Sequence, residues 1–210
     1  MAKGLLLVAF DFTNAHEDEF HDWYDLEHIP ERQRVPGFGL CERWINVANP
    51  KQAIATYDLD SLEVLKTPPY LAIAYGNLSV WSKRVGPMCT RLIRFDGKQT
   101  LPGDADSPHG AGGLLVNAMN VAPEHDAEFN EWYDHEHIPA LAAVPGVLSA
   151  RRFKDPTGTH RYLALYHLKT PEVTLGADWK NAAATPWTER LRPHFNNHLR
   201  ILARRYVRGG

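Results

Sequence analysis

The sequence predicts an α+β protein made of two ferredoxin-like units, each with the element order βαββαβ. The first observation is a repeated segment, residues 19–37 and 128–146, in which an aromatic pair, a carboxylate and a histidine precede a Val-Pro-Gly turn. The second is the extent of the repeat, because residues 4–59 align with residues 113–168 without insertion or deletion. The third is that β-prone apolar runs and one amphipathic helical segment follow each other in the same order in both copies.

The repeat divides the chain into a first unit over residues 1–96, a linker over 97–112 and a second unit over 113–210. The linker is polar and rich in glycine and proline, which predicts a flexible segment. A ferredoxin-like sheet carries its helices on one face, so its other, apolar face must also be covered. We therefore expect the two sheets to cover each other in a barrel-like pseudo-dimer within one chain.

Each unit is expected to begin with a buried strand that is apolar, rich in β-prone residues and preceded by or begun with glycine. An amphipathic helix comes next, and the acidic residues at its start suit the positive end of the helix dipole. Pro30 and Pro139 are expected to end these helices, because proline lacks the amide hydrogen that a helix interior needs. The expected ranges are 4–12 and 113–121 for the strands, and 15–28 and 123–137 for the helices.

The rest of each unit is expected to form two strands, a helix and a final strand. Val-Pro-Gly turns lead into the second strand, and proline-containing loops separate it from the third. A less regular region follows, where insertions shift the register between the copies. The expected strands are 38–47, 53–59 and 90–95 in the first copy and 147–154, 161–168 and 199–207 in the second, with helices at 78–85 and 186–191.

Composition argues against several functional classes. A net charge of −2 gives no basic footprint for nucleic acid. The C-terminal arginines (Arg200, Arg204, Arg205 and Arg208) are interpreted as a solvated strand edge and tail. The two cysteines show neither metal-type spacing nor a disulfide framework. The apolar N-terminal run is too short for a membrane span and lacks a signal-peptide pattern, so we expect a cytoplasmic protein that does not bind membranes.

One face of each predicted helix runs from aromatic rings into a carboxylate and an imidazole. Its members are Phe20, Trp23, Tyr24, Glu27 and His28 in the first copy, and Phe129, Trp132, Tyr133, Glu136 and His137 in the second. Burying an unpaired charge is costly. The carboxylate and the imidazole must therefore be compensated, be hydrated in a cavity, or act on a ligand.

Two interpretations of this face stay open. In the structural one, Glu27 and Glu136 hold backbone amides of the following turn, and the histidines cap carbonyls at the helix end. In the functional one, a histidine is a general acid or base and the carboxylate orients it. The tryptophans and tyrosines either pack in the core or wall a ligand site.

The second copy is expected to hold the better-formed pocket, because it carries more imidazoles and a smaller, more apolar loop after its helix. Tyr166 or His167 would form the pocket floor and Trp187 its rim. His135 and His137 project from different sides of a helix and cannot share a metal there, and zinc-like spacing is absent from the sequence. Glycine-rich nucleotide loops are absent as well. The sequence thus predicts neither a metal nor another cofactor.

The phrase F-x-x-W-Y-x-x-E-H-I-P, followed by V-P-G, resembles the EthD-like branch of the dimeric α/β-barrel superfamily, here in a tandem two-copy form. The resemblance covers residues 4–59 and 113–168. It implies paired ferredoxin-like units with a ligand cavity between sheet and helices, and it supports His28 and His137 as pocket residues. The superfamily includes muconolactone isomerases, polyketide cyclases, cofactor-free monooxygenases and haem-handling enzymes.

The expected function is a cofactor-independent enzyme of aromatic compound catabolism, an isomerase, cyclase or lyase that moves a proton on a carbonyl-bearing, aromatic-derived or lactone-type metabolite. His137 or His28 would transfer the proton, Glu136 or Glu27 would set the histidine tautomer, and His167 is a further catalytic candidate. The expected substrate-binding residues are Trp132, Tyr133, Trp23, Tyr24, Tyr166, His135 and Trp187.

Two alternatives are kept: a metabolite-binding module without catalysis, and a haem- or metal-dependent enzyme of the same fold. The expected partner is a small-molecule substrate, with a homodimer of the two-repeat chain as a further expectation.

Overall fold

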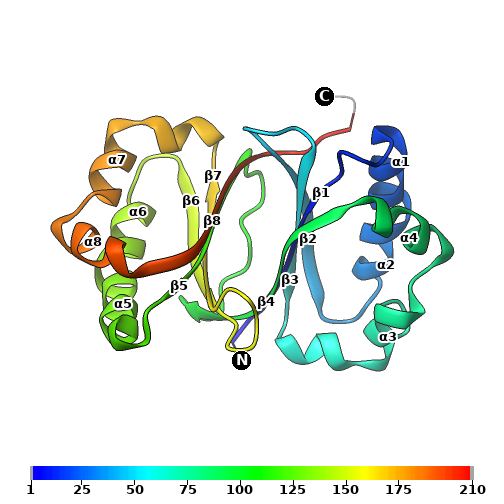
Figure 1. Ribbon diagram of the computed structural model, residues 1–210, viewed down its shortest axis with the longest axis horizontal. Helices are drawn as coiled ribbons and strands as arrows, with labels where there is room; N and C mark the ends of the chain where they lie inside the picture. The colour runs from blue at the N-terminus through cyan, green and yellow to red at the C-terminus, as the bar shows by residue number, and fades with distance from the viewer. Residues whose placement is uncertain (1, 209–210) are drawn as a thin grey trace.

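The computed structural model describes residues 2–208 as antiparallel strands with helices on their outer sides (Figure 1). The predicted α+β class is confirmed. The strands are β1 (Gly4–Asp11), β2 (Phe38–Asn46), β3 (Gln52–Leu59), β4 (Thr90–Leu101), β5 (Gly113–Val121), β6 (Val147–Lys154), β7 (Tyr162–Leu168) and β8 (Phe195–Arg205). Across residues 2–208, the helices are all too short or too polar to cross a membrane.

The strands close into one barrel in the order β1-β3-β2-β8-β5-β7-β6-β4. Strands β1–β4 come from the N-terminal half of the chain and β5–β8 from the C-terminal half. The halves therefore meet at two seams, β2–β8 and β4–β6. Only three residue pairs are in register at each seam, whereas eight join β1 to β3. Backbone pairing across the seams is thus short, and side chains must contribute much of the contact.

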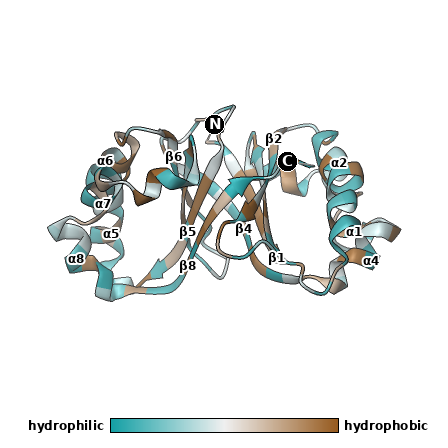
Figure 2. Cartoon of the chain, turned by 90° about the horizontal axis from the view of Figure 1, so that it is seen from above, coloured by the Kyte–Doolittle hydropathy of each residue, from teal (hydrophilic) through white to brown (hydrophobic). Residues whose placement is uncertain are grey.

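Both faces of β1, β3, β5 and β7 are buried, which explains their largely apolar sequences. In β1, Leu5, Leu7 and Ala9 point into the barrel, where they pack with side chains from both halves. Leu6 points outward into a second core beneath the N-terminal helices. A third core lies between the outer sheet face and the helices of the C-terminal half. Figure 2 shows hydrophobic strands in the centre and the two helical layers at either end.

The α-helices form two similar sets, one for each half. They are α1 (Glu17–Asp22), α2 (Ile29–Gln33), α3 (Pro68–Leu71) and α4 (Val80–Val85), then α5 (Asp126–Trp132), α6 (Ile138–Ala142), α7 (Ala177–Ala183) and α8 (Pro186–Leu191). Two π-helical turns are η1 (Trp23–His28) and η6 (Tyr133–His137); the 3₁₀ turns are η2 (Leu62–Lys66), η3 (Tyr75–Asn77), η4 (Gly86–Met88), η5 (Pro123–His125), η7 (Pro171–Leu175) and η8 (Arg192–His194). The sequence did not predict α3 and α7, which fall in the irregular regions.

The first helix of each half continues through its proline, which corrects the expected stop at Pro30 and Pro139. Each proline lies in the first turn of a new α-helical segment, α2 or α6. The π-helical turn comes directly before it, and there the Ile29 amide donates to the Tyr24 carbonyl, five residues earlier. This wider turn shifts the hydrogen-bond register where proline has no amide and where its ring would otherwise clash with the preceding turn.

The Val-Pro-Gly turns then redirect the chain into β2 and β6. Gly37 has φ +92° and Gly146 has φ +94°, in the left-handed region that favours glycine. A Cβ at Gly37 would lie 2.5 Å from a methyl of Val64, and one at Gly146 would lie 2.7 Å from a methyl of Val173. Both copies therefore retain glycine for conformational and steric reasons.

Part of the predicted linker over 97–112 belongs to strand β4, and the rest is held against the barrel. Strand β4 extends to Leu101 and pairs with β6. The Gln99 side chain then accepts hydrogen bonds from the amides of Gly103 and Ala105, 3.0 Å each. Ser107 is buried and its amide donates to Asp58 at 2.6 Å. This segment is held against the barrel because its polar groups satisfy buried partners.

Buried ionisable groups cross between the halves inside the barrel. The Arg151 guanidinium donates to Asp58 at 3.0 Å, and the two side chains are 1% and 5% exposed. Glu42 lies 3.8 Å from His167 and 2.5 Å from Arg205. Arg205, which the sequence placed in a solvated tail, therefore supplies the cation for a buried carboxylate.

These contacts are related by the repeat. Arg151 lies 109 residues after Glu42, and His167 lies 109 residues after Asp58. This is the spacing of the repeat, which also separates Glu19 from Glu128. In one contact a residue of β6 meets a residue of β3, and in the other a residue of β2 meets a residue of β7, so each contact joins the two halves. The carboxylate lies on β3 in one contact and on β2 in the other, so two N-terminal halves would bring Asp58 and Glu42 against each other.

Replacing Arg151 with methionine should lower the free energy of unfolding by about 3–5 kcal/mol, because Asp58 would stay buried without its cation. Arg190→Met is the matched control, since it breaks an ion pair whose side chains are 61% and 36% exposed. That loss should stay below about 1 kcal/mol. Urea unfolding measures both variants, and equal losses would contradict a role for the buried pair in holding the halves together.

Candidate functional site

The repeated aromatic–carboxylate–histidine motif forms a π-helical turn in both halves. The Ile29 amide donates to Tyr24 in η1, and the Ile138 amide donates to Tyr133 in η6. Such turns are rare and are frequently found at functional sites. The turn brings the histidine that ends each motif beneath the helices that follow.

The motif tryptophans join the first helix of each half to a later one. The Trp23 indole donates to Ser82 at 3.0 Å, and the Trp132 indole donates to Thr188 at 3.2 Å. Ser82 lies in α4 and Thr188 in α8. These bonds are the same in both halves, which indicates a structural role for the indole nitrogens.

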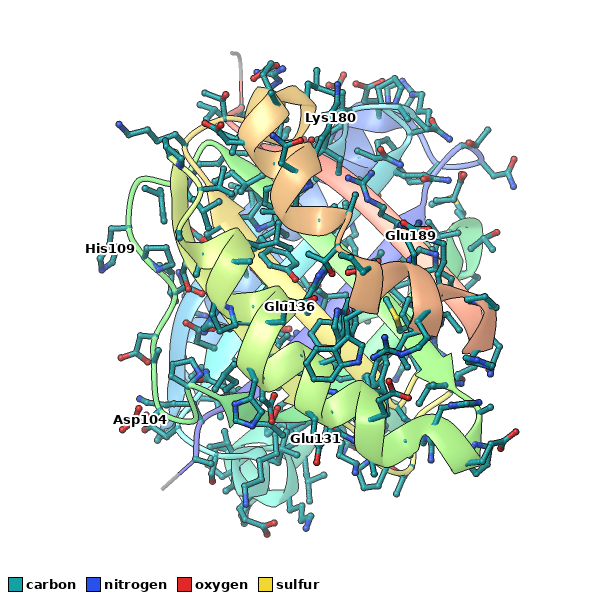
Figure 3. All side chains as sticks on the ribbon, turned by 90° about the vertical axis from the view of Figure 1, so that its left-hand side faces the viewer. Asp104, His109, Glu131, Glu136, Lys180 and Glu189 are labelled. Atoms are coloured by element: carbon teal, nitrogen blue, oxygen red, sulfur yellow. The ribbon has the colours of Figure 1, made fainter. Side chains whose placement is uncertain are left out.

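The motif glutamates bind the N-caps of these later helices. Glu27 accepts a hydrogen bond from Ser79, the N-cap of α4. Glu136 accepts one from Thr185, the N-cap of α8, and Figure 3 shows Glu136 where its helix faces α7 and α8. Among residues 2–208, neither carboxylate is hydrogen-bonded to the histidine that follows it. This geometry corrects the expectation that the glutamates set the histidine tautomers.

The motif tyrosines are covered by arginines. Arg43 pairs with Asp25 at 2.5 Å and lies 4.5 Å over the Tyr24 ring. In the second half, Arg152 pairs with Asp134 at 2.9 Å and lies 4.5 Å over the Tyr133 ring. Tyr24 and Tyr133 are therefore core residues at the sheet–helix boundary, and the structure places them behind the cavity walls described next.

After these bonds are assigned, a histidine and a strand tyrosine remain in each half. Within residues 2–208, the Nδ1 atoms of His28 and His137 are buried without a hydrogen-bond partner, as are the hydroxyls of Tyr57 and Tyr166. Each histidine and tyrosine line one cleft between the sheet and the helices. These clefts are the candidate sites.

The C-terminal cleft has a volume of about 300 Å³, at the lower end for small-molecule sites. Tyr166 forms part of its sheet side, and Trp132, His137 and Trp179 approach from the helices. Its complete lining is Leu115, Asn117, Met119, Trp132, His137, Leu141, Tyr166, Trp179, Ala183, Thr188, Arg192, Phe195, His198 and Arg200. The N-terminal cleft is smaller, about 240 Å³, and contains His28, Trp23 and Tyr57.

His137 is a neutral imidazole at physiological pH. Burial, with a smaller contribution from the positive charge of Arg192, lowers its pKa to about 4. The ring packs on Trp132 with centroids 4.2 Å apart. An efficient general base has a pKa near the working pH, so His137 is poorly suited to proton shuttling. A neutral imidazole is instead what a metal centre requires.

Three other sequence candidates lie away from the clefts. His135 is exposed on the helix. His167 lies inside the barrel beside Glu42 and Trp44, on the opposite sheet face from Tyr166. Trp187 donates its indole hydrogen to Glu128 at 3.0 Å and is not among the residues that line the C-terminal cleft.

Asn117, His198 and Arg200 are cleft residues that the sequence did not indicate. His198 is hydrogen-bonded to Asn117 at 2.6 Å, and Arg200 lies at the open side. The sequence placed Arg200 in a solvated basic run, yet the alternation of β8 directs this residue toward the helices. Alignment of β8 with β4 would have revealed it, because Arg94 is its counterpart.

No protein-family model and no curated protein sequence matches this chain. Solved structures do match it over nearly its whole length. A protein proposed to be a chlorite dismutase has TM-score 0.69 and 12% identity, covering 99% of this chain and 96% of its own. A protein proposed to be a monooxygenase, from Fusobacterium nucleatum, has TM-score 0.62 and 10% identity, with 98% and 93% covered. A single-residue variant of the chlorite dismutase of Candidatus Nitrospira defluvii has TM-score 0.62 and 12% identity, with 98% and 92% covered.

Identities this low show the fold alone, a mixed α+β barrel of the dimeric α/β type. The names of these neighbours nevertheless contradict the expected cofactor-independent isomerase, cyclase or lyase, because they denote a monooxygenase and chlorite dismutases. The low pKa of His137 and the N-cap role of Glu136 give independent physical reasons for this correction.

The buried position of His167 predicts acid sensitivity rather than catalysis. Burial, followed by the charges of Arg151 and Arg205, lowers its pKa to about 3 from 6.5; Glu42 also faces it. As the pH falls, the unfolded chain therefore binds a proton at this histidine before the folded chain does. The stability that the neutral His167 contributes is present above pH 6.5 and is lost as the pH falls toward 3.

The free energy of unfolding of the unsubstituted protein should fall when the pH is lowered from about 7 to about 4.5. In the His167→Gln variant this fall should be smaller by about 2–3 kcal/mol. Urea unfolding at the two pH values measures this. His135→Gln, at an exposed position, should retain the acid loss of the parent chain. If the two variants behave alike, His167 is not buried in its neutral form.

Proposed function

We propose that this chain is an enzyme of oxidative small-molecule chemistry with a haem site in the C-terminal cleft. The observation that carries the proposal is His137, a neutral buried imidazole that lines the cleft beside Trp132 and Leu141. Neighbours of the same fold include chlorite dismutase structures in complex with cyanide and with imidazole. Imidazole is a good ligand for transition metals, so these complexes support a metal centre in those enzymes.

The donor groups present fit a haem better than a bare metal ion, although the cleft of about 300 Å³ is small for a tetrapyrrole. Among residues 2–208, no group of three or more His, Cys, Asp or Glu side chains could hold a metal. A haem can be held by a single protein ligand, and His137 would hold it. Trp132, Leu141 and Phe195 would pack against the macrocycle. A bound haem supplies one-electron and oxygen chemistry, while the cleft residues position it and limit water.

Haemin added to the purified protein should give a Soret band that saturates at one equivalent. His137→Ala should abolish the saturable band, because it removes the proposed axial ligand. His28→Ala, the matched change in the N-terminal cleft, should leave the titration unchanged. A titration that is insensitive to His137→Ala, or an absence of saturable binding to the parent chain, would contradict the haem site.

A second candidate is a monooxygenase that holds its substrate directly in the same cleft. The volume of about 300 Å³ favours it, because a site of that size suits a metabolite of one ring better than a tetrapyrrole. A neighbour proposed to be a monooxygenase has the same fold. The haemin titration separates the two candidates, since this one requires no Soret band.

We also propose that the chain is a tandem pseudo-dimer with units close to the predicted boundaries, in the manner of the EthD-like branch. The repeated motif, the barrel order and the crosswise pairs of the two halves support this. A protease site inserted after His109 should yield two fragments that elute together, because each covers the apolar face of the other. Each fragment expressed alone should fail to form a folded monomer, and a folded soluble monomer of either would overturn the proposal.

A homodimer of the whole chain stays a separate prediction, which sedimentation would test.

A further inference from the structure

Arg94 and Arg200 occupy equivalent places in the two clefts. Arg94 on β4 is paired with Val8 on β1, and Arg200 on β8 is paired with Asn117 on β5. Val8 and Asn117 are themselves 109 residues apart, the spacing of the repeat. Both arginines line their clefts, so a difference in their surroundings distinguishes the two sites.

Arg94, the N-terminal counterpart of Arg200, is occupied by partners from its own half, although Arg32 and Arg91 also line that cleft. Arg94 donates to Asp96 at 3.0 and 3.2 Å and to the Tyr70 hydroxyl at 3.3 Å. The guanidinium charge is therefore neutralised by a carboxylate on the same strand. A ligand anion would have to compete with these internal bonds.

Both partners are replaced in the C-terminal half. Leu202 is paired with Leu115 as Asp96 is paired with Leu6, and Trp179 lies 109 residues after Tyr70. Leucine offers no hydrogen-bonding group, and an indole nitrogen can only donate. Within the part of the chain that the structure covers, Arg200 accordingly has neither an ion pair nor a side-chain hydrogen bond.

The rest of the C-terminal cleft favours an anion. Its lining contains Arg192 and Arg200 together with two histidines, and residues 2–208 contribute no aspartate or glutamate to it. Arg192 is already paired with Glu189 at 2.8 Å. Arg200 is exposed at the open side of the cleft, so an anion can reach its guanidinium from solvent.

We infer that the C-terminal cleft binds an aromatic carboxylate, with Arg200 holding the carboxylate and the aromatic body lying among Trp132, Trp179 and Phe195. Arginine presents a planar set of donors that matches a carboxylate, and the aromatic side chains supply an apolar contact surface. The inference rests on the proposed function in taking this cleft as the site. The carboxylate could belong to a haem propionate or to a free one-ring acid.

Four probes distinguish these sources: benzoate and its neutral counterpart benzyl alcohol, and haemin and its dimethyl ester. Quenching of tryptophan fluorescence measures affinity, because Trp132 and Trp179 line the cleft. At least one carboxylate probe should bind at least about tenfold more tightly than its neutral counterpart, since a charge-assisted hydrogen bond is lost in the latter. Preference for benzoate alone identifies a free acid, and preference for haemin alone identifies propionate.

Arg200→Gln should remove that preference. Leu202→Asp should remove it too while leaving the arginine in place, because it restores the internal carboxylate that Arg94 has in the other half. Leu202→Asn is the matched control and should keep at least part of the preference, since it adds polarity without charge. Arg94→Gln should have no effect on binding in this cleft. Circular dichroism checks the fold of each variant, and Arg200→Gln carries the test if Leu202→Asp does not fold.

The inference is overturned if neither carboxylate probe binds more tightly than its neutral counterpart, or if Arg200→Gln leaves the preference intact. Its failure differs from failure of the haem proposal. Haemin that binds through His137 without dependence on Arg200 would keep the haem site and remove the anion site. Benzoate that binds through Arg200 in a protein without a Soret band would do the reverse.

Discussion

The closure of one barrel by two four-stranded sheets is the constraint on which the other features of this protein depend. Backbone pairing at the seams is limited to three residue pairs each, so the barrel interior must hold the halves together. Apolar side chains from both halves fill it. Its buried charges also select the partner, because two N-terminal halves would set Glu42 against Asp58. Two carboxylates in contact act against such pairing, whereas the pair of Arg151 and Asp58 joins unlike halves.

Burial of one strand face inside the barrel determines where a ligand can bind. The inner face is consumed by the contact between the halves, and the outer face is covered by helices that need attachment to each other. The repeated motif provides that attachment, because Trp132 and Glu136 bind the first turn of α8 and its N-cap. The cleft is the space that these tethers hold between the helices and the sheet. Retention of the motif in both halves is thus explained mainly by architecture, and His28 and His137 are the members whose Nδ1 atoms lack protein partners within residues 2–208.

The sequence was most informative where structure follows from local pattern. The strands Gly113–Val121 and Val147–Lys154 have the expected bounds, because apolar runs, glycine and Val-Pro-Gly turns determine them locally. The continuation through Pro30 could not be foreseen, since it depends on a shift to five-residue hydrogen bonding that composition does not reveal. The contact between Glu42 and His167 joins residues far apart in the chain, so only the barrel order brings them together. The charge of Arg200 was visible, but its availability depends on what surrounds it in three dimensions.

The two clefts differ in how the charge of their equivalent arginines is satisfied. Both halves keep the histidine and the strand tyrosine, and these groups alone do not distinguish a site from its copy. The distinction comes from the residues beside the arginine, which either pair with its guanidinium or leave it unpaired. Asp96 and Tyr70 satisfy Arg94 internally, which stabilises the N-terminal half but leaves that cation less available. Leu202 and Trp179 stand where those partners would be, so within residues 2–208 Arg200 has no ion pair or side-chain hydrogen bond at the open side of its cleft. Of the two equivalent arginines, Arg200 is therefore the one whose guanidinium is free to meet an external anion without displacing an internal carboxylate.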